Sequence, residues 1–170
     1  MAFQTINPVN NKVVKTFEEI NDAALDKTVT KAVNTFDEWK KTDYKVRAQL
    51  LYKVAGLLRS KKTELAKMIT LEMGKLFIHA EGEIKLSAEI FDYYAKNAEG
   101  FLVDKILNPV HGKALIRYSP VGVLLGIQPW NFPFYQVARF AAPNIMIGNT
   151  VLIKHASNVP QCAIAIEEIF

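Results

Sequence analysis

The sequence predicts an α/β fold in which helices pack on a parallel sheet. Two apolar runs, VGVLLGI at residues 121–127 and TVLIKH at residues 150–155, are typical of buried parallel strands. A helical pattern lies between them and another follows the second run. Strands joined through a helix in this order predict a right-handed parallel crossover. Residues 21–104, which precede both runs, are mainly helical by their apolar spacing.

The N-terminal residues predict a hairpin followed by a helix. Turn-forming residues at positions 7–11, NPVNN, separate two strand-like pieces within residues 3–17, which predicts a small hairpin. Asn21 is a candidate N-cap for the helix that follows. Apolar residues then recur at helical spacing, at Ala24, Leu25, Val29, Ala32, Val33 and Phe36.

Residues 46–75 continue the helical pattern. A break is expected near Ser60, with Thr63 capping the next helix and Gly74 ending it. Residues 79–103 predict a further long helix. One face of that helix is apolar and carries Ile84, Ala88, Phe91 and Ala95.

The pattern changes near Asn108-Pro109. Residues 113–127 alternate at first and then become continuously apolar. They predict a strand, a turn at Ser119-Pro120 and a second, fully buried strand.

Residues 131–149 predict a helix that Pro143 bends or interrupts and Gly148 closes, and residues 162–170 predict a final helix. Two buried parallel strands leave both outer edges of their sheet unpaired. We therefore expect the 170 residues to be the front part of a longer polypeptide.

Charge and composition exclude several classes of protein. The 21 Lys and Arg are spread among 17 Asp and Glu, giving a net charge of +4 without a concentrated basic patch, so nucleic-acid binding is not expected. One cysteine excludes an internal disulfide framework and a multi-cysteine zinc site. No leader pattern or membrane-length apolar run occurs, so a soluble, cytoplasmic protein without a membrane partner is expected.

Isolated histidines and acidic residues on helices are weak candidates for a site. His79, His111 and His155 lack metal-ligand spacing. Four glutamates lie in helical stretches rich in lysine, and we interpret them as solvated: Glu72, Glu81, Glu83 and Glu89.

The candidate site lies where the two buried strands end. Ligands of open α/β sheets bind beyond the carboxyl ends of the strands. The first strand ends in QPWN, with Trp130 and Asn131, and the second in KHAS, with Lys154 and Ser157. An asparagine amide can donate to a developing oxyanion, whereas Lys and Ser can bind sugar hydroxyls or a phosphate.

Each of these residues also has a simpler explanation. Trp130 could seal the edge of the core, Asn131 could cap the following helix, and Lys154 could be a solvated strand end. Taken together, two polar strand ends in consecutive βα units favour a site. No GxGxxG or GxxxxGK[ST] motif is present, so a nucleotide would not use the usual glycine-rich cradle.

Several motifs are similar to those of the aldehyde dehydrogenase superfamily. GIQPWNFPF, then Arg139, then GNTVLIKHAS resemble its PWNFP segment and lysine-bearing strand. TINPVNNKVV, LEMGK and RYSPVGVLLGI resemble its opening segment, its E-x-G-K helix end and its lead into the cofactor domain. The resemblance implies a Rossmann-like sheet. Residues 1–170 would be the N-terminal portion of the NAD(P)-binding domain, with a hairpin at 1–17, a helical part at 21–104 and a βαβα start at 113–170.

The resemblance also implies roles for individual residues. Asn131 would be the catalytic asparagine that stabilises the oxyanion of a thiohemiacetal. Ile127, Pro129 and Trp130, together with Asn131, would form the wall of the nicotinamide cleft, and Lys154 would reach the adenosine ribose hydroxyls.

Ser157 bears on the choice of cofactor. It stands where many NAD-preferring members have glutamate, and a carboxylate there would repel a 2'-phosphate. NAD and NADP therefore both remain open as cofactors.

Arg139 bears on the substrate. The resemblance to succinate semialdehyde dehydrogenases implies that it contacts the remote carboxylate of the substrate, for which a guanidinium is suited. A helix-surface or interdomain ion pair is the alternative. His155 stands where a proline is commoner in the superfamily. The segment with histidine resembles most a bacterial subgroup of succinate semialdehyde dehydrogenases.

The resemblance also implies a covalent step, in which a cysteine thiolate attacks the aldehyde, and the residues for this step are missing here. Cys162 opens an apolar helix and is interpreted as a buried packing residue, so the nucleophilic cysteine, the general-base glutamate and the catalytic and oligomerisation domains would lie outside these residues. These residues alone would not catalyse, whereas the complete protein is expected to oxidise a small aldehyde as a homodimer or homotetramer. The alternatives are a different aldehyde substrate, or a noncatalytic interaction module.

Overall fold

The computed structural model describes residues 3–170. Residues 1 and 2, part of the predicted hairpin region, lie outside the described residues. The strands are β1 (Phe3–Ile6), β2 (Val13–Phe17), β3 (Lys105–Leu107), β4 (Ala114–Ile116), β5 (Val123–Gln128) and β6 (Thr150–His155). The helices are α1 (Asp22–Trp39), α2 (Tyr44–Ser60), α3 (Lys62–Met73), α4 (Phe77–Phe101), α5 (Pro133–Ile147) and α6 (Pro160–Ile169).

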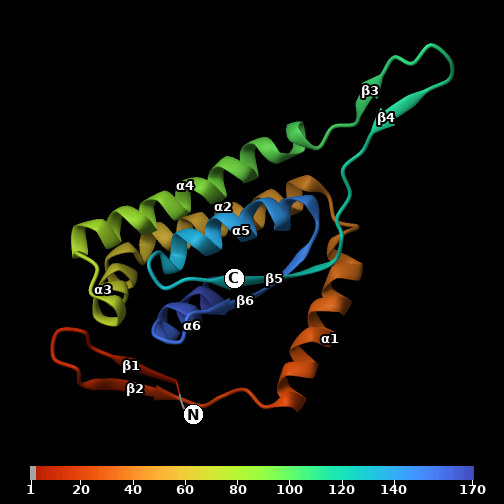
Figure 1. Ribbon diagram of the computed structural model, residues 1–170. Helices are drawn as coiled ribbons and strands as arrows, with labels where there is room; N and C mark the ends of the chain where they lie inside the picture. Colours follow the sequence, from red (N-terminus) through yellow and green to blue (C-terminus); the bar gives the residue numbers. More distant parts are fainter. Residues whose placement is uncertain (1–2) are drawn as a thin grey trace.

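Helices form most of the fold and cover one face of a short parallel sheet. Figure 1 shows α2, α4 and α5 side by side above β5. The last helix, α6, follows β6 and packs against α2, α3 and α5. The β3–β4 hairpin projects away from the helices (Figure 1). The mixture of helices with a parallel sheet confirms the predicted α/β class.

The β1–β2 hairpin and the start of α1 occur where the sequence predicts them. β1 and β2 pair antiparallel, with Phe3 opposite Phe17. The Asn21 side chain accepts a hydrogen bond of 2.9 Å from the N–H of Ala24 and so caps α1. Most of the apolar residues on α1 are not buried, because only Ala32 among them is packed away from solvent.

The break between α2 and α3 is near Ser60, but the predicted cap is wrong. The N-cap position of α3 is Lys61, and Thr63 lies inside the helix, where its hydroxyl bonds Glu81 Oε1 at 3.1 Å. Gly74 ends α3 as predicted, with a left-handed φ of 75° that glycine adopts without strain. Pro8 of the first hairpin packs against this glycine, 3.3 Å from where a Cβ would stand.

The hydrophobic core lies between the helices. The predicted apolar face of α4 is buried, with Ile84 and Ala88 fully inaccessible and Phe91 nearly so. This face packs against α2 and α5, whose buried residues include Leu51 and Val137. The apolar spacing of α4 therefore correctly predicts the side on which the core lies.

One buried arginine ties three helices together. The Arg47 guanidinium, on α2, donates to the carbonyl of Met146 at 2.9 Å near the end of α5. It also donates to the carbonyls of Lys40 at 3.0 Å and Thr42 at 2.8 Å, just after α1. Burial lowers the pKa of Arg47 from its ordinary value, and these carbonyls solvate its charge.

The strands around residue 110 differ from the prediction. Residues 105–107, which the sequence analysis assigns to no strand, form β3 and pair antiparallel with β4. Asn108-Pro109 therefore lies in the loop of a hairpin. The prediction of a fully buried second strand is also wrong, because β5 alternates: Leu125 is 62 % and Ile127 is 73 % exposed, whereas Gly126 and Gln128 are buried.

The βαβ unit has the predicted order. β5 and β6 pair in parallel, and α5 connects them. Pro143 does not interrupt α5, which continues from Pro133 to Ile147, and Gly148 closes it with a φ of 107°. A proline at this position removes one backbone hydrogen bond of the helix without ending it.

Candidate functional site

The parallel register brings the two strand ends together. Ile127 pairs with Lys154 and Gln128 with His155. The N–H of Ala156 then donates to the carbonyl of Gln128 at 3.0 Å. The carboxyl ends of β5 and β6 are thus neighbours at one edge of the sheet, as the sequence analysis predicts.

The predicted site residues lie on or near this edge with their side chains exposed. They are Ile127, Pro129, Trp130, Asn131, Lys154 and Ser157, with Arg139 further along α5. Trp130 is 49 % exposed, so it does not seal the core in this chain. Phe132, not Asn131, holds the N-cap position of α5, so the Asn131 amide is not used to cap that helix.

The turn from β5 into α5, residues 128–135, is here called the β5–α5 corner. Glu83 of α4 caps the helix in it: Oε1 accepts from the N–H of Phe134 at 2.9 Å and of Tyr135 at 3.2 Å. The side chain of Glu83 is completely buried. The interpretation of Glu83 as a solvated residue is therefore wrong, because its carboxylate binds the positive end of a helix.

Lys75 and His155 also contact the β5–α5 corner. Lys75, just after α3, donates to Glu83 Oε2, and its ammonium lies 3.6 Å from the centre of the Phe132 ring. His155 Nε2 lies 3.0 Å from the carbonyl oxygen of Pro133 and acts as the donor, because a carbonyl can only accept. Burial lowers the pKa of His155, which favours the neutral ring.

The turn from β6 into α6, residues 155–162, is the β6–α6 corner. Glu72 of α3 accepts from the N–H of Gln161 at 2.9 Å and of Cys162 at 2.8 Å. The hydroxyl of Thr5, from the first hairpin, donates to the same carboxylate at 2.6 Å. Glu72 is buried, so its interpretation as solvated is also wrong.

Cys162 is buried, as predicted. Burial and the neighbouring Glu72 carboxylate both raise the pKa of its thiol above the ordinary value. A thiol that stays protonated is a poor nucleophile, which agrees with a packing role.

The Asn149 side chain and a close contact at Gly126 hold β5 and β6 in place. Asn149 Oδ1 accepts from the N–H of Val121 at 2.7 Å and of Gly122 at 3.0 Å, which joins the starts of the two strands. At Gly126 the Phe140 ring of α5 approaches so closely that a Cβ would lie 2.7 Å from it.

Aromatic contacts lead from the β5–α5 corner to Arg139. The Phe132 and Tyr135 rings have centroids 5.8 Å apart, and the Arg139 guanidinium lies 5.4 Å from the Tyr135 ring. Tyr135 and Arg139 are one helical turn apart and share a face of α5. Within residues 3–170, none of the ion pairs involves Arg139. The alternative role of Arg139, an ion pair on the helix surface, therefore has no partner in this range.

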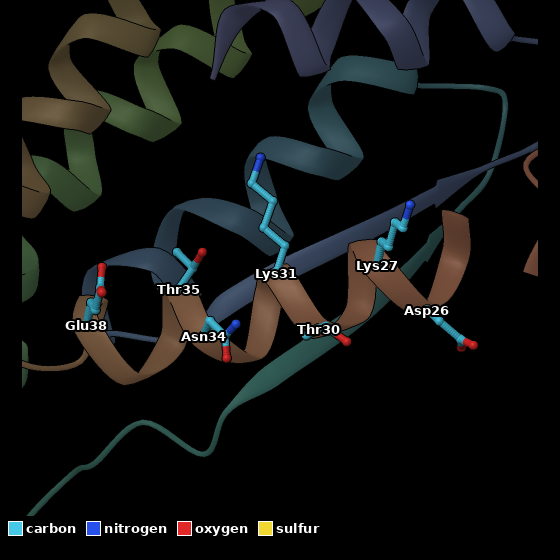
Figure 2. A pocket seen from close by; sticks show the side chains of 7 residues that line it. All are labelled: Asp26, Lys27, Thr30, Lys31, Asn34, Thr35 and Glu38. Carbon is cyan, nitrogen blue, oxygen red and sulfur yellow. The ribbon is translucent and has the colours of Figure 1, made fainter. Parts of the chain in front are cut away.

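Two hollows on the surface lie away from these corners. One of about 480 Å³ runs along α1 and is lined by seven residues of that helix alone, Asp26, Lys27, Thr30, Lys31, Asn34, Thr35 and Glu38. Figure 2 shows that Lys31 and Asp26 point in different directions, so these polar groups do not converge on one ligand. The other, of about 460 Å³, is lined mainly by α1 and the first residues of β6, with Leu50, Ile145 and Phe170.

No helix in residues 3–170 is long and apolar enough to cross a membrane. In the same residues, no group of three or more His, Cys, Asp or Glu side chains is placed to hold a metal ion.

The fold and the two corners define an α/β protein in which two neighbouring parallel strands end at one edge of the sheet. A family model described as the aldehyde dehydrogenase family matches residues 1–170, and the chain belongs to this family.

Individual relatives agree with the family assignment. The chain is 44 % identical over 168 residues to a protein of Deinococcus radiodurans named succinate-semialdehyde dehydrogenase [NADP(+)], and 43 % identical to a Synechocystis protein named as probably the same enzyme. These alignments cover 99 % and 100 % of this chain but 35 % and 37 % of the relatives, so the chain spans about a third of their length.

A solved structure with a similar fold comes from Streptococcus pyogenes. It is a succinic semialdehyde dehydrogenase in complex with NADP+, with a TM-score of 0.96 and 40 % sequence identity to this chain. The similarity covers 99 % of this chain and 37 % of that one.

Proposed function

We propose that the chain is part of an aldehyde dehydrogenase that oxidises succinate semialdehyde to succinate with NADP as the preferred cofactor. The observation that carries the proposal is the parallel pairing of β5 with β6, in which Lys154 pairs with Ile127, just before the β5–α5 corner that bears Asn131. Membership of the aldehyde dehydrogenase family supports the reaction class. The names of the relatives support the substrate and the cofactor.

Asn131 would act on the reacting aldehyde. Its exposed amide can donate a hydrogen bond to the aldehyde oxygen as negative charge develops there. Because the amide is held by a short turn between a strand and a helix, it would need little reorganisation during the reaction. The nucleophile would come from residues outside this chain.

The edge residues fit the chemical groups of a nicotinamide dinucleotide. The exposed Ile127 and Trp130 offer apolar surface to a nicotinamide ring, and the exposed Lys154 and Ser157 offer donors to ribose hydroxyls or a phosphate. When bound, the cofactor would supply the hydride acceptor.

Ser157 favours NADP over NAD. A carboxylate at this position would repel the 2'-phosphate of NADP, and a serine hydroxyl does not. In the complete protein, Ser157→Glu should therefore lower kcat/KM for NADP more than for NAD. A larger loss with NAD would contradict the placement of Ser157 beside the ribose.

Arg139 would bind the remote carboxylate of the substrate. It is exposed on the face of α5 that continues from the β5–α5 corner, and the described residues supply no acidic partner for it. A charged hydrogen bond of this kind contributes about 1.5 to 3 kcal/mol, or roughly 10- to 100-fold in kcat/KM.

Substitution of Arg139 in the complete protein tests the substrate. Arg139→Ala should lower kcat/KM for succinate semialdehyde by about 10- to 100-fold and leave that for butanal nearly unchanged. Arg59→Ala is the matched control, because Arg59 is an exposed arginine of α2 that pairs with Asp92. An equal loss for both aldehydes would point to a different substrate.

Association of the complete protein as a homodimer or homotetramer is also proposed. The projecting β3–β4 hairpin exposes apolar side chains, with Ile106 at 77 % and Val110 at 92 %. Exposed apolar patches of this kind mark contact sites. Light scattering on the complete protein would give its mass, and a monomer would refute this part of the proposal.

A further inference from the structure

Lys75 makes two contacts that converge on the segment next to Asn131. Its side chain is only 10 % exposed, and it leaves the chain directly after the left-handed Gly74 that ends α3. The ammonium bonds Glu83 and also faces the ring of Phe132, the residue after Asn131. A part-buried lysine is thus shared between the capping carboxylate of α5 and the loop that carries the amide.

We propose that Lys75 is a positioning residue for Asn131, acting through Glu83 and Phe132. The inference rests on the proposed role of Asn131 as a donor to the aldehyde oxygen. Lys75 itself does not reach the substrate in this role. It fixes the direction in which the Asn131 amide points.

The geometry explains why a charge is needed at this position. Glu83 holds the first N–H groups of α5, and Lys75 forms an ion pair with that buried carboxylate and keeps it in place. The same ammonium attracts the face of the Phe132 ring, which a desolvated cation does more strongly than an exposed one. A neutral side chain at position 75 would lose both contacts at once.

The expected effect is on kcat rather than KM. An oxyanion donor acts mainly in the transition state, so its displacement lowers kcat while ground-state binding is retained. Complete loss of such a donor costs about 100- to 1,000-fold in kcat. Displacement by about 1 Å costs up to roughly 100-fold.

The test uses the complete protein with succinate semialdehyde and NADP. Lys75→Met should lower kcat by about 10- to 100-fold and change either KM by less than about threefold. Lys75→Arg should recover most of the loss, because a guanidinium keeps the charge and stacks on an aromatic ring. Lys62→Met is the matched control, since Lys62 and Glu81 also join α3 to α4, at 3.3 Å, but on an exposed surface.

Two double variants separate an effect on the position of Asn131 from an effect on stability. If Lys75 acts through Asn131, Lys75→Met should have little further effect on kcat in an Asn131→Ala background. The double variant Lys75→Met with Glu83→Gln should regain thermal stability, because no buried charge is left unpaired, yet its kcat should stay low without the Phe132 contact.

The possible results are distinguishable. Wild-type kcat in Lys75→Met, or an equal loss with and without Asn131, would overturn the inference while leaving the proposed function intact. Absence of aldehyde oxidation by the wild-type protein would refute the proposed function instead. A crystal structure of Lys75→Met then decides the geometric part, because residues 131–135 in an unchanged position would overturn it.

Discussion

The β5–α5 and β6–α6 corners use the same device with different partners. In each, a buried glutamate from the helical layer binds two N–H groups at the start of the helix that follows a parallel strand. Glu83 in the first corner also has the lysine Lys75 as counter-ion. Within residues 3–170 Glu72 forms no ion pair, and Thr5 supplies a hydroxyl instead.

The difference between lysine in one corner and threonine in the other shows how a buried carboxylate is stabilised beside a helix. The N-terminal N–H groups carry partial positive charge, so together with one hydroxyl they can satisfy a carboxylate without a cation. Adding a lysine creates a second buried charge that depends on the first. The β5–α5 corner, which bears Asn131, should therefore tolerate change less than the β6–α6 corner.

The largest expected effect comes from the same substitution in both corners. Glu83→Gln leaves the part-buried Lys75 ammonium without its counter-ion, and should lower the free energy of unfolding by about 3 to 5 kcal/mol. Glu72→Gln strands no cation and should cost about 1 to 3 kcal/mol. Urea denaturation followed by circular dichroism measures both. Equal costs would show that the counter-ion does not distinguish the corners.

A smaller effect is expected from filling the contact between Gly126 and Phe140. Gly126→Ala places a methyl group 2.7 Å from the ring and should cost about 1 to 3 kcal/mol in the same assay. Gly56→Ala is the control, because this exposed glycine of α2 has no atom within 4 Å of a new Cβ and lies in a helix. It should stabilise by up to about 1 kcal/mol. A neutral Gly126→Ala would mean that α5 can shift away from β5.

The hydroxyl on Glu72 should have a modest effect. Thr5→Val removes the hydrogen bond to the carboxylate and should lower the free energy of unfolding by about 1 to 2 kcal/mol. Thr16→Val on β2 is matched, because among residues 3–170 the hydroxyl of Thr16 accepts a hydrogen bond only from the exposed Gln4 amide, at 3.5 Å. A similar loss in both variants would refute the role of Thr5 in the β6–α6 corner.

The smallest effect is a dependence of stability on pH. Burial lowers the pKa of His155 below its ordinary 6.5, although the Pro133 carbonyl and the Glu72 charge oppose the shift. The unfolded chain therefore binds a proton first, so stability is complete above 6.5 and decreases as the pH falls below it.

His155→Gln tests this dependence because glutamine keeps a donor for Pro133 but does not titrate. The decrease in unfolding free energy from about pH 8 to about pH 5 should be smaller in this variant than in the wild type. Identical pH profiles would exclude His155 as the source.

Patterns local in sequence predicted much of the fold. Asn21, Gly74 and Gly148 mark helix ends through their own backbone or side-chain chemistry, so each boundary could be placed from a few residues. The strand ends that carry Asn131 and Lys154 were found in the same way. Three-residue strands such as β3 have too short a pattern to be recognised.

The positions of Glu72 and Glu83 could not be predicted because their partners are distant in sequence. Glu83 binds Phe134, 51 residues later, and Glu72 binds Cys162, 90 residues later. In a lysine-rich helix, a glutamate bound to a distant helix looks like a solvated one. The LEMGK motif contains both Glu72 and Lys75, but it gives no information about what they contact.

Arg47 has a consequence for how the fold opens. Its guanidinium donates to the carbonyl of Lys40, just after α1, and to that of Met146, in the last turn of α5. Helices normally fray first at such ends. Loss of either helix end would leave a buried cation with unsatisfied donors, so α1, α2 and α5 should unfold as one cooperative unit. Amide hydrogens near residues 36–40 and 144–149 should therefore exchange with solvent at similar, slow rates, although they are about a hundred residues apart in the chain.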